Sequence, residues 1–121
     1  TVRLTHFVVK WAMLLILRKK ATKKELDNLA EHFKGYIKIV VDIDKEIMAA
    51  GADRHFDEEK ELLAQGSKQE NLWGGGVDVE SKEIDYNSII NLRPNQDNPS
   101  RDILSKNLRE KLDKIVKRFL F

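Results

Sequence analysis

Hydrophobic and polar positions recur with different periods along the chain, and those periods predict a mixed α and β structure. The most apolar stretch covers residues 7–17, in which we expect a buried strand at residues 14–17. A membrane span would need about 20 apolar residues, and this run is shorter and contains Lys10. A signal peptide would end at small residues, whereas a basic run follows here. We therefore expect no membrane partner, and we interpret Met13 as a candidate natural start, with residues 1–12 as an N-terminal extension.

Residues 23–34 have the period of an amphipathic helix. Thr22 and Glu25 are placed to form a capping box, in which each side chain accepts a hydrogen bond from the other residue's backbone amide. Gly35 follows as a helix terminator. The apolar residues that share one face are Leu26, Leu29, Ala30 and Phe33.

Residues 36–48 alternate with period two, which predicts a strand with one buried face. The other face would carry three carboxylates in a row, those of Asp42, Asp44 and Glu46. A helix over residues 42–50 is the alternative, because Asp-Lys-Glu-Ile-Met-Ala-Ala favours helix locally. We expect the strand, ended by the small residues that follow.

The second half of the chain predicts a short helix, two strands and a long helix. Their expected ranges are 57–65, 71–80, 84–92 and 99–120. Asp57 suits the N-cap of the short helix, and Asn98 followed by Pro99 suits the start of the long one. The order is therefore strand, helix, strand, helix, strand, strand, helix. It predicts an α+β fold, a small and mainly antiparallel sheet with helices packed on one face.

Length and composition limit the class of protein. With 121 residues the chain has the size of one domain, and we assign residues 13–121 to a single α+β domain. The net charge of +2, from 22 basic and 20 acidic residues, argues against a dedicated nucleic-acid coat protein. The absence of cysteine excludes a disulfide scaffold, a zinc–thiolate site and a cysteine nucleophile. It also fits a reducing, cytoplasmic location.

Cations dominate the exposed face of the last predicted helix. They are Lys106, Arg109, Lys111, Lys114, Lys117 and Arg118, against Glu110 and Asp113. We interpret this face as solvated, because no aromatic residues are interleaved with the cations for base stacking. Nucleic acid is therefore a partner that the sequence permits but does not favour.

His55 is the candidate acid–base residue, because histidine titrates near neutral pH. Asp42, Glu46 or Asp57 could orient its ring, and the first two complete the candidate catalytic set. The alternative is a loop histidine that bonds a backbone carbonyl, with Asp57 only a helix cap. No zinc site is predicted, because one histidine and no cysteine accompany the carboxylates. An oxygen-ligand Mg²⁺ or Ca²⁺ site on Asp42, Asp44 and Glu46 stays open, and no cofactor is assigned.

Two polar runs, residues 66–76 and 91–101, are richer in glutamine, asparagine, arginine and glycine than a core or a plain surface requires. In the first run, Gln69 offers a donor and an acceptor, and Trp73 precedes three glycines that would leave its ring free to stack on a base. The alternative, favoured by the usual burial of tryptophan, is that Trp73 belongs to the core and the glycines form a bulge or turn. The run is not a P-loop, because no Gly-Lys-Ser/Thr stands at the required offset.

The second run predicts an anion site. Arg93 would close a strand, Gln96 and Asn98 would lie in a loop, and Ser100 and Arg101 would lie in the first turn of the last helix. Free helix amides with two guanidinium groups suit phosphate or carboxylate. In a structural alternative, both arginines pair with the acidic residues of the earlier strand and hold the loop to the sheet. The candidate ligand-binding residues from both runs are Gln69, Trp73, Arg93, Gln96, Asn98, Ser100 and Arg101.

From about Met13 to its end, the chain resembles a small family of bacterial and archaeal proteins catalogued only as a domain of unknown function. The residues that carry the resemblance are Val-Val-Asp-Ile-Asp-Lys-Glu-Ile-Met-Ala at 40–49, His55 with Asp57, Gly-Ser-Lys-Gln-Glu-Asn-Leu-Trp-Gly at 66–74, Ile-Asn-Leu-Arg-Pro at 90–94, Asn98, Ser100 and Arg101. The resemblance implies a compact soluble domain and adds no mechanism. Residues 1–12 lie outside it.

Three functions from different classes fit these patterns. The first is a binding module for a small anionic or nucleotide-like ligand. The second is a small phosphoester hydrolase in which His55 is the acid or base, Glu46 or Asp42 its partner, and Arg93 with Arg101 the clamp on developing charge. The third is a structural or assembly protein with a symmetric interface, and a homodimer is our expectation for so small a domain. The first two require that the polar runs share a cleft.

Overall fold

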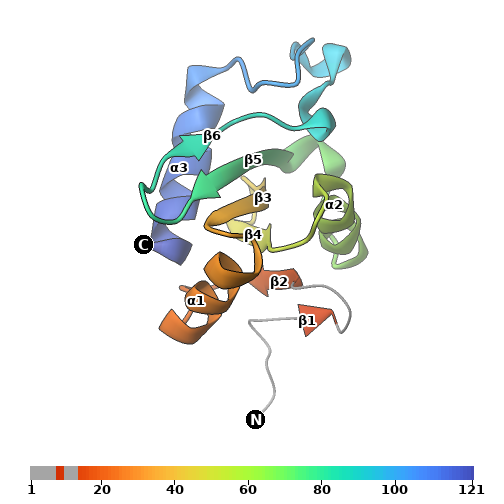
Figure 1. Cartoon of the computed structure of the whole chain (residues 1–121). Coiled ribbons are helices and arrows are strands. Elements are labelled where there is room, and N and C mark those ends of the chain that lie inside the picture. Colours follow the sequence, from red (N-terminus) through yellow and green to blue (C-terminus); the bar gives the residue numbers. More distant parts are fainter. Residues whose placement is uncertain (1–7, 10–13) are drawn as a thin grey trace.

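The computed structural model describes residues 8, 9 and 14–121. Within them, six strands form one antiparallel sheet in the order β1-β2-β4-β3-β5-β6 (Figure 1). The strands are β1 Val8–Val9, β2 Leu14–Leu17, β3 Tyr36–Asp42, β4 Ile47–Ala50, β5 Leu72–Asp78 and β6 Ile84–Asp85. The helices are α1 Lys23–His32, α2 His55–Ala64 and α3 Lys106–Leu120, with short 3₁₀ turns η1 Gln69–Asn71, η2 Ile89–Asn91 and η3 Pro94–Gln96. The α+β class and the antiparallel sheet are confirmed. The candidate start Met13 and most of residues 1–12 lie outside the described residues.

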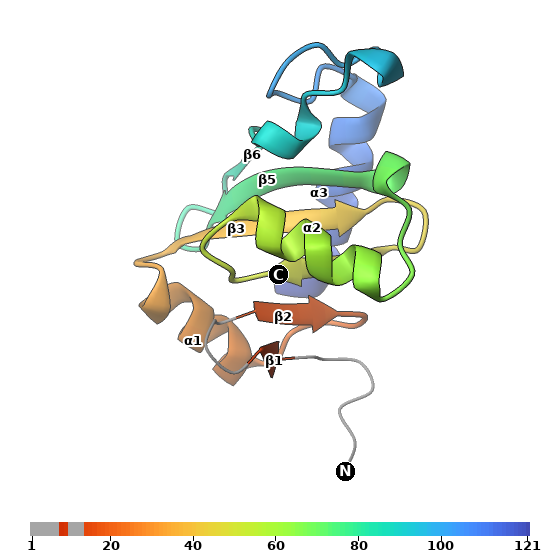
Figure 2. The same cartoon turned by 90° about the vertical axis from the view of Figure 1, so that its right-hand side faces the viewer.

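Helices cover both faces of the sheet. Figure 2 shows α2 in front of the sheet and α3 behind it. In the central strand, Ile39 packs in the cluster that contains residues of α1 and α3, whereas Val40 packs in a second cluster with Leu62 of α2. The expectation that the helices share one face is thus corrected for α2. The sequence contained one sign that this second face is covered: Val40 is an apolar residue on the face of the strand that otherwise carries Lys38 and Asp42.

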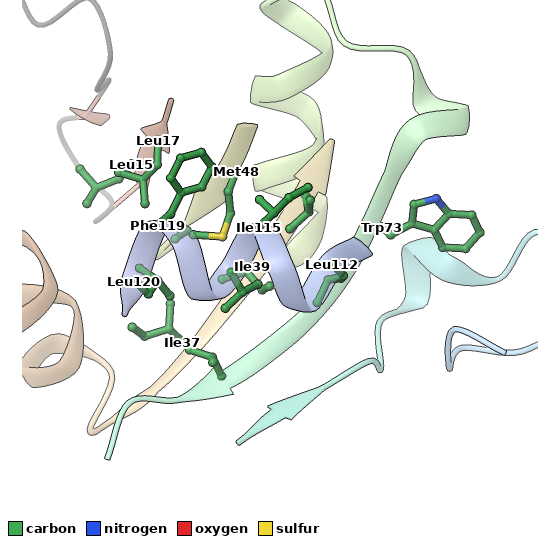
Figure 3. Packing of buried hydrophobic residues seen from close by; sticks show 14 of the residues in the cluster. Leu15, Leu17, Ile37, Ile39, Met48, Trp73, Leu112, Ile115, Phe119 and Leu120 are labelled. Carbon is green, nitrogen blue, oxygen red and sulfur yellow. The ribbon is translucent and has the colours of Figure 1, made fainter. Parts of the chain in front are cut away.

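The cluster between the sheet and α3 is the larger of the two. Figure 3 shows Leu112, Ile115 and Phe119 of α3 directed against residues of the sheet, among them Ile39 and Met48. These five side chains are all buried. The apolar stripe predicted for the last helix is therefore its core face, and α1 joins the same cluster through Leu29.

The predicted strand over residues 36–48 is a hairpin of two strands. β3 ends at Asp42, whose side chain accepts hydrogen bonds from the amides of Asp44 (2.9 Å) and Lys45 (2.8 Å). Glu46 adopts a left-handed conformation with φ of 56°, and its amide donates to the Asp42 carbonyl at 2.9 Å. Aspartate is suited to this turn because its side chain replaces backbone partners. The prediction of a continuous strand, and of an acidic row along it, is wrong.

The last helix is shorter than predicted. It begins at Lys106, with the Ser105 hydroxyl accepting the amide of Leu108 at 3.2 Å, so Asn98 is not its cap. The Asn98 side chain instead donates to the carbonyls of Asn91, Ser100 and Asp102 and accepts the amide of Leu104. An amide that satisfies four backbone groups stabilises an irregular segment.

Two other boundaries differ from expectation. The strand predicted over 84–92 is only β6, and the chain then enters the loop that Asn98 organises. Helix α2 begins at His55 rather than at Asp57, with Arg54 at the N-cap position. Within the part of the chain that the structure describes, none of the helices has the length and apolar character needed to cross a membrane.

Candidate functional site

A depression of about 420 Å³ opens on the sheet face that α2 covers. Its walls come from three separate parts of the chain: Tyr36 and Lys38 on β3, the start of α2, and the segment from β6 to Arg101. His55 and Arg101 both line it, although 46 positions separate them in the sequence. Arg93 is not among the lining residues. Of the two predicted arginines, only one therefore shares a pocket with the histidine.

The three glycines of β5 allow the walls to lie close to the strand. A Cβ on Gly74 would lie 2.7 Å from the Ser88 hydroxyl and 3.2 Å from the His55 ring. A Cβ on Gly76 would overlap the Tyr36 hydroxyl. A larger residue at position 74 would press on Ser88 and His55, and one at position 76 would displace Tyr36. The glycines thus act through close approach of side chains to the backbone.

His55 is the first residue of α2, and its ring is held by the floor of the depression. Nε2 lies 2.6 Å from the carbonyl oxygen of Gly75, so it carries the proton and donates it. Burial, together with the charge of Lys38, lowers the pKa of His55 below its ordinary value of 6.5 against the opposing effect of the carbonyl. The ring is therefore neutral near pH 7, and Nδ1 has a lone pair that can accept a proton or a hydrogen bond.

Positive charge outweighs negative charge in the lining. Lys38 donates from Nζ to the carbonyl of Asp53 at 2.8 Å, and Arg54 is bonded to Asp57 by two contacts of 3.0 Å. Arg101 is exposed, and within residues 14–121 its guanidinium has no hydrogen bond or ion pair. Asp85 is the acidic residue of the lining.

The carboxylate of Asp85 is engaged by the Tyr36 hydroxyl, which donates to it at 2.6 Å. Burial, assisted by this carboxylate, raises the pKa of Tyr36, so the hydroxyl keeps its proton. Tyr36 is therefore a fixed wall rather than a base.

Asn91 connects the floor of the depression to its wall. The side chain, fully buried, exchanges hydrogen bonds with both backbone groups of Gly74 at 2.8 and 2.9 Å. It also donates to the carbonyls of Tyr86 and Arg101. The backbone of Arg101 is further held by the amide of Ser88 at 3.0 Å. These bonds fix the main chain of Arg101 beside β5, whereas its guanidinium has no partner among the described residues.

Arg93 and Trp73 form a separate, structural cluster. Trp73 is buried, and the guanidinium of Arg93 lies 3.9 Å from the centre of its ring. The two terminal nitrogens of Arg93 donate to the carbonyls of Gln69 and Leu72. Burial lowers the pKa of Arg93, against the opposing charge of Glu59. Arg93 holds a loop to the sheet, but its partners are backbone carbonyls and not the carboxylates expected.

The other predicted ligand-binding residues also bond to nearby protein groups. Gln69 donates to Glu59 at 3.3 Å, and Gln96 donates to the carbonyl of Glu70 at 3.1 Å. The Ser100 hydroxyl accepts the amide of Asp102 at 3.0 Å, and Asn98 organises its loop as described above. Ser100 and Arg101 precede α3 and are not part of its first turn.

None of the three proposed partners of His55 lines the depression, and each is engaged by another group. Asp42 is buried and accepts the Ser67 hydroxyl at 2.6 Å, in addition to the turn amides. Glu46 is paired with Arg118 at 2.6 Å, and Asp57 is paired with Arg54. Among the described residues, no group of three or more histidine, aspartate or glutamate side chains is placed to hold a metal ion.

Sequence reasoning missed several residues of the depression, notably Tyr36, Lys38, Arg54, Phe56 and Asp85. The three consecutive glycines were the available signal, because they mark a strand that other side chains approach closely. The identity of those side chains depends on the pairing of β3 with β5 and β6. That pairing is not encoded in any local pattern.

The fold and the depression together define an α+β protein with a small, cation-lined site on one face of its sheet. The family model described as "Protein of unknown function (DUF5674)" matches residues 15–119, and the chain belongs to this family. A comparison with curated proteins and one with solved structures gave no match.

Proposed function

We propose that this protein is a binding module for a small anionic ligand, which occupies the depression beside His55 and Arg101. The observation that carries the proposal is the guanidinium of Arg101, which has no partner among the described residues and lines a depression that Lys38 and Arg54 also line. Guanidinium groups bind carboxylate and phosphate through paired hydrogen bonds. An arginine that is fixed through its main chain and free at its head group is suited to that role.

The surroundings favour an anion over a cation. Besides the three cations, helix α2 begins in the wall of the depression, and no side chain caps its first turn. Helix N-termini carry partial positive charge from their free amides. Two carboxylates oppose these charges: Asp57 is paired with Arg54, and Asp85 accepts a hydrogen bond from the Tyr36 hydroxyl. Lys38 and Arg101 remain as cations without a carboxylate partner among the described residues. Ser88, which also lines the depression, adds a hydroxyl that can donate.

The test is calorimetric titration of pyrophosphate into the wild type and two variants. Arg101→Ala removes the proposed anion ligand, and Arg118→Ala removes an arginine of α3 outside the depression. Each variant lowers the net charge by one, so the pair separates a site from a general charge effect. We expect Arg101→Ala to weaken binding at least about tenfold, as the loss of a charge-assisted hydrogen bond implies. Equal weakening in both variants, or no saturable binding, would overturn the proposal.

Phosphoester hydrolysis is the second candidate, favoured by the neutral His55 beside Arg101. With Nε2 donating to Gly75, Nδ1 is the nitrogen that could take a proton from water or a hydroxyl. His55→Gln keeps a donor for the Gly75 carbonyl but removes the base. We expect any turnover of nitrophenyl phosphate to be lost in this variant while pyrophosphate binding is retained. Turnover that survives in His55→Gln, or that is absent from the wild type, would contradict this candidate.

Two further inferences concern the location and the assembly of the protein. We infer a cytoplasmic location because the chain has no cysteine, which fits a reducing compartment. A homodimer, or an assembly role, is the third candidate function. Sedimentation equilibrium over a hundredfold concentration range measures it. A monomer at every concentration would contradict self-assembly.

A further inference from the structure

The mouth of the depression gathers exposed hydrophobic side chains. Among the described residues, six large hydrophobic side chains are exposed, and three of them line this depression. They are Tyr36, Phe56 and Ile89. Phe56 is 54% exposed and Ile89 is 53% exposed. Apolar surface is thus concentrated where the cations are, whereas single exposed residues elsewhere need no explanation.

Phe56 has no structural role in either core. It is the second residue of α2, and it belongs to neither of the two hydrophobic clusters. Its ring contacts a cation, because the guanidinium of Arg54 lies 5.8 Å from the ring centre. That guanidinium is itself held by Asp57. An exposed aromatic ring at the start of a helix is available to stack on a planar ligand.

Trp73 cannot stack on a ligand in this way. Its ring is buried and lies beneath the guanidinium of Arg93. Two exposed aromatic residues, Tyr36 and Phe56, line the depression together with Arg101. The hydroxyl of Tyr36 is bonded to Asp85 and its ring lies against Gly76, so stacking on a ligand ring falls to Phe56, the more exposed of the two.

We propose, building on the proposed anion-binding function, that the ligand is an aromatic phosphate of about mononucleotide size. Its planar ring packs between Phe56 and Ile89, and its phosphate meets Arg101 and Lys38. A volume of about 420 Å³ lies within the range of small-molecule sites, which are typically about 300–1,000 Å³. An inorganic anion alone would leave the apolar part of the depression in contact with water. A purely apolar ligand would leave the guanidinium of Arg101 without a partner among the described residues.

The experiment compares ligands that share a phosphate but differ in the ring. Inorganic phosphate, ribose 5-phosphate, adenosine monophosphate and uridine monophosphate are titrated by calorimetry. The proteins are the wild type, Phe56→Ala and Arg101→Ala. Leu104→Ala is the control, because Leu104 is 55% exposed and does not line the depression. Circular dichroism melting curves check that the variants fold.

We expect at least one nucleotide to bind about tenfold or more tightly than ribose 5-phosphate, as one stacked base implies. Phe56→Ala should remove that advantage and leave ribose 5-phosphate binding unchanged. Arg101→Ala should weaken every phosphate, and Leu104→Ala should change none. These results together would support an aromatic phosphate as the ligand.

Two outcomes would overturn the inference, and they are distinguishable. If ribose 5-phosphate binds in an Arg101-dependent manner but neither nucleotide binds more tightly, the anion site stands and the stacking role of Phe56 fails. The same holds if Phe56→Ala has the effect of Leu104→Ala. If no phosphate binds through Arg101, the anion site and the aromatic ligand both fail.

Discussion

Glu58 is a carboxyl group buried inside the protein without a charged hydrogen-bond partner. It is the fourth residue of α2, and its side chain is fully buried. Oε2 accepts the amide of Ala52 at 3.0 Å, while Oε1 has no partner. Burial raises the pKa of Glu58 well above its ordinary value of 4.5, although the Ala52 amide and Lys38 oppose the shift. The folded protein therefore keeps this proton at pH values where an unfolded chain has lost it.

Glu58→Gln should change the pH dependence of stability. Between pH 4.5 and the raised pKa, the folded state binds one proton more than the unfolded state. The free energy of unfolding must then fall as pH rises, by about 1.4 kcal/mol for each pH unit in that window. Below the ordinary pKa, Glu58 is protonated in both the folded and the unfolded state, so it no longer makes the free energy of unfolding depend on pH. Glutamine is neutral at every pH, so the variant lacks this slope.

The assay is urea denaturation of both proteins at several pH values from 4 to 9. We expect the stability of Glu58→Gln, minus that of the wild type, to rise by about 1.4 kcal/mol per pH unit above pH 5 and then to level off. Other titrating groups, His55 among them, cancel in the difference. Glu110→Gln controls for the loss of an exposed carboxyl group of α3. A difference between Glu58→Gln and the wild type that is constant with pH would refute a neutral, buried Glu58.

Three further substitutions test how the site is held. In Gly75→Ala, the methyl group meets the carbonyl of Asp85, so we expect the free energy of unfolding to fall by about 1–3 kcal/mol; a variant as stable as the wild type would contradict this close approach. Arg93→Met leaves two backbone carbonyls without their donor and should cost about 2–4 kcal/mol in urea, with pyrophosphate affinity unchanged; lost affinity in the folded variant would instead place Arg93 in the site. Asn98→Ala removes the acceptor of the Leu104 amide, so hydrogen exchange there should accelerate, and unchanged protection would argue against the bond.

The sequence alone was enough to predict a structural feature where the two interacting residues lie within one helical turn of each other. The capping box of Thr22 and Glu25 is present as predicted, and the helix that it starts is α1. The hairpin between β3 and β4 was missed because its turn preserves the period. Ile43 and Ile47 continue the alternation of apolar and polar residues that begins in β3, so the sequence pattern does not mark the turn. The turn is seen only in the structure, where the side chain of Asp42 accepts a turn amide.

The candidate site was only partly predictable, because its partners are backbone groups. Arg93 was correctly suspected of holding a loop, but it bonds to the carbonyls of Gln69 and Leu72, which any residue could supply. His55 likewise bonds to the carbonyl of Gly75, as the structural alternative for this residue anticipated. Side-chain chemistry indicates which groups need partners, but long-range strand pairing decides which partners they meet. His55 and Arg101 line the same depression because the backbone of β5 holds His55 and because Asn91 and Ser88 hold the main chain of Arg101.

The most direct measurement follows the side-chain Nε–H resonances of the arginines by NMR while adenosine monophosphate is added to the wild type. We predict that the Arg101 resonance and the backbone amides of His55 and Phe56 shift and saturate together, because these residues share the depression. The Arg93 resonance should stay in place, because its guanidinium is already bonded to the chain. Saturable shifts at Arg93 with none at Arg101 would contradict the assignment of the site, as would a complete absence of shifts.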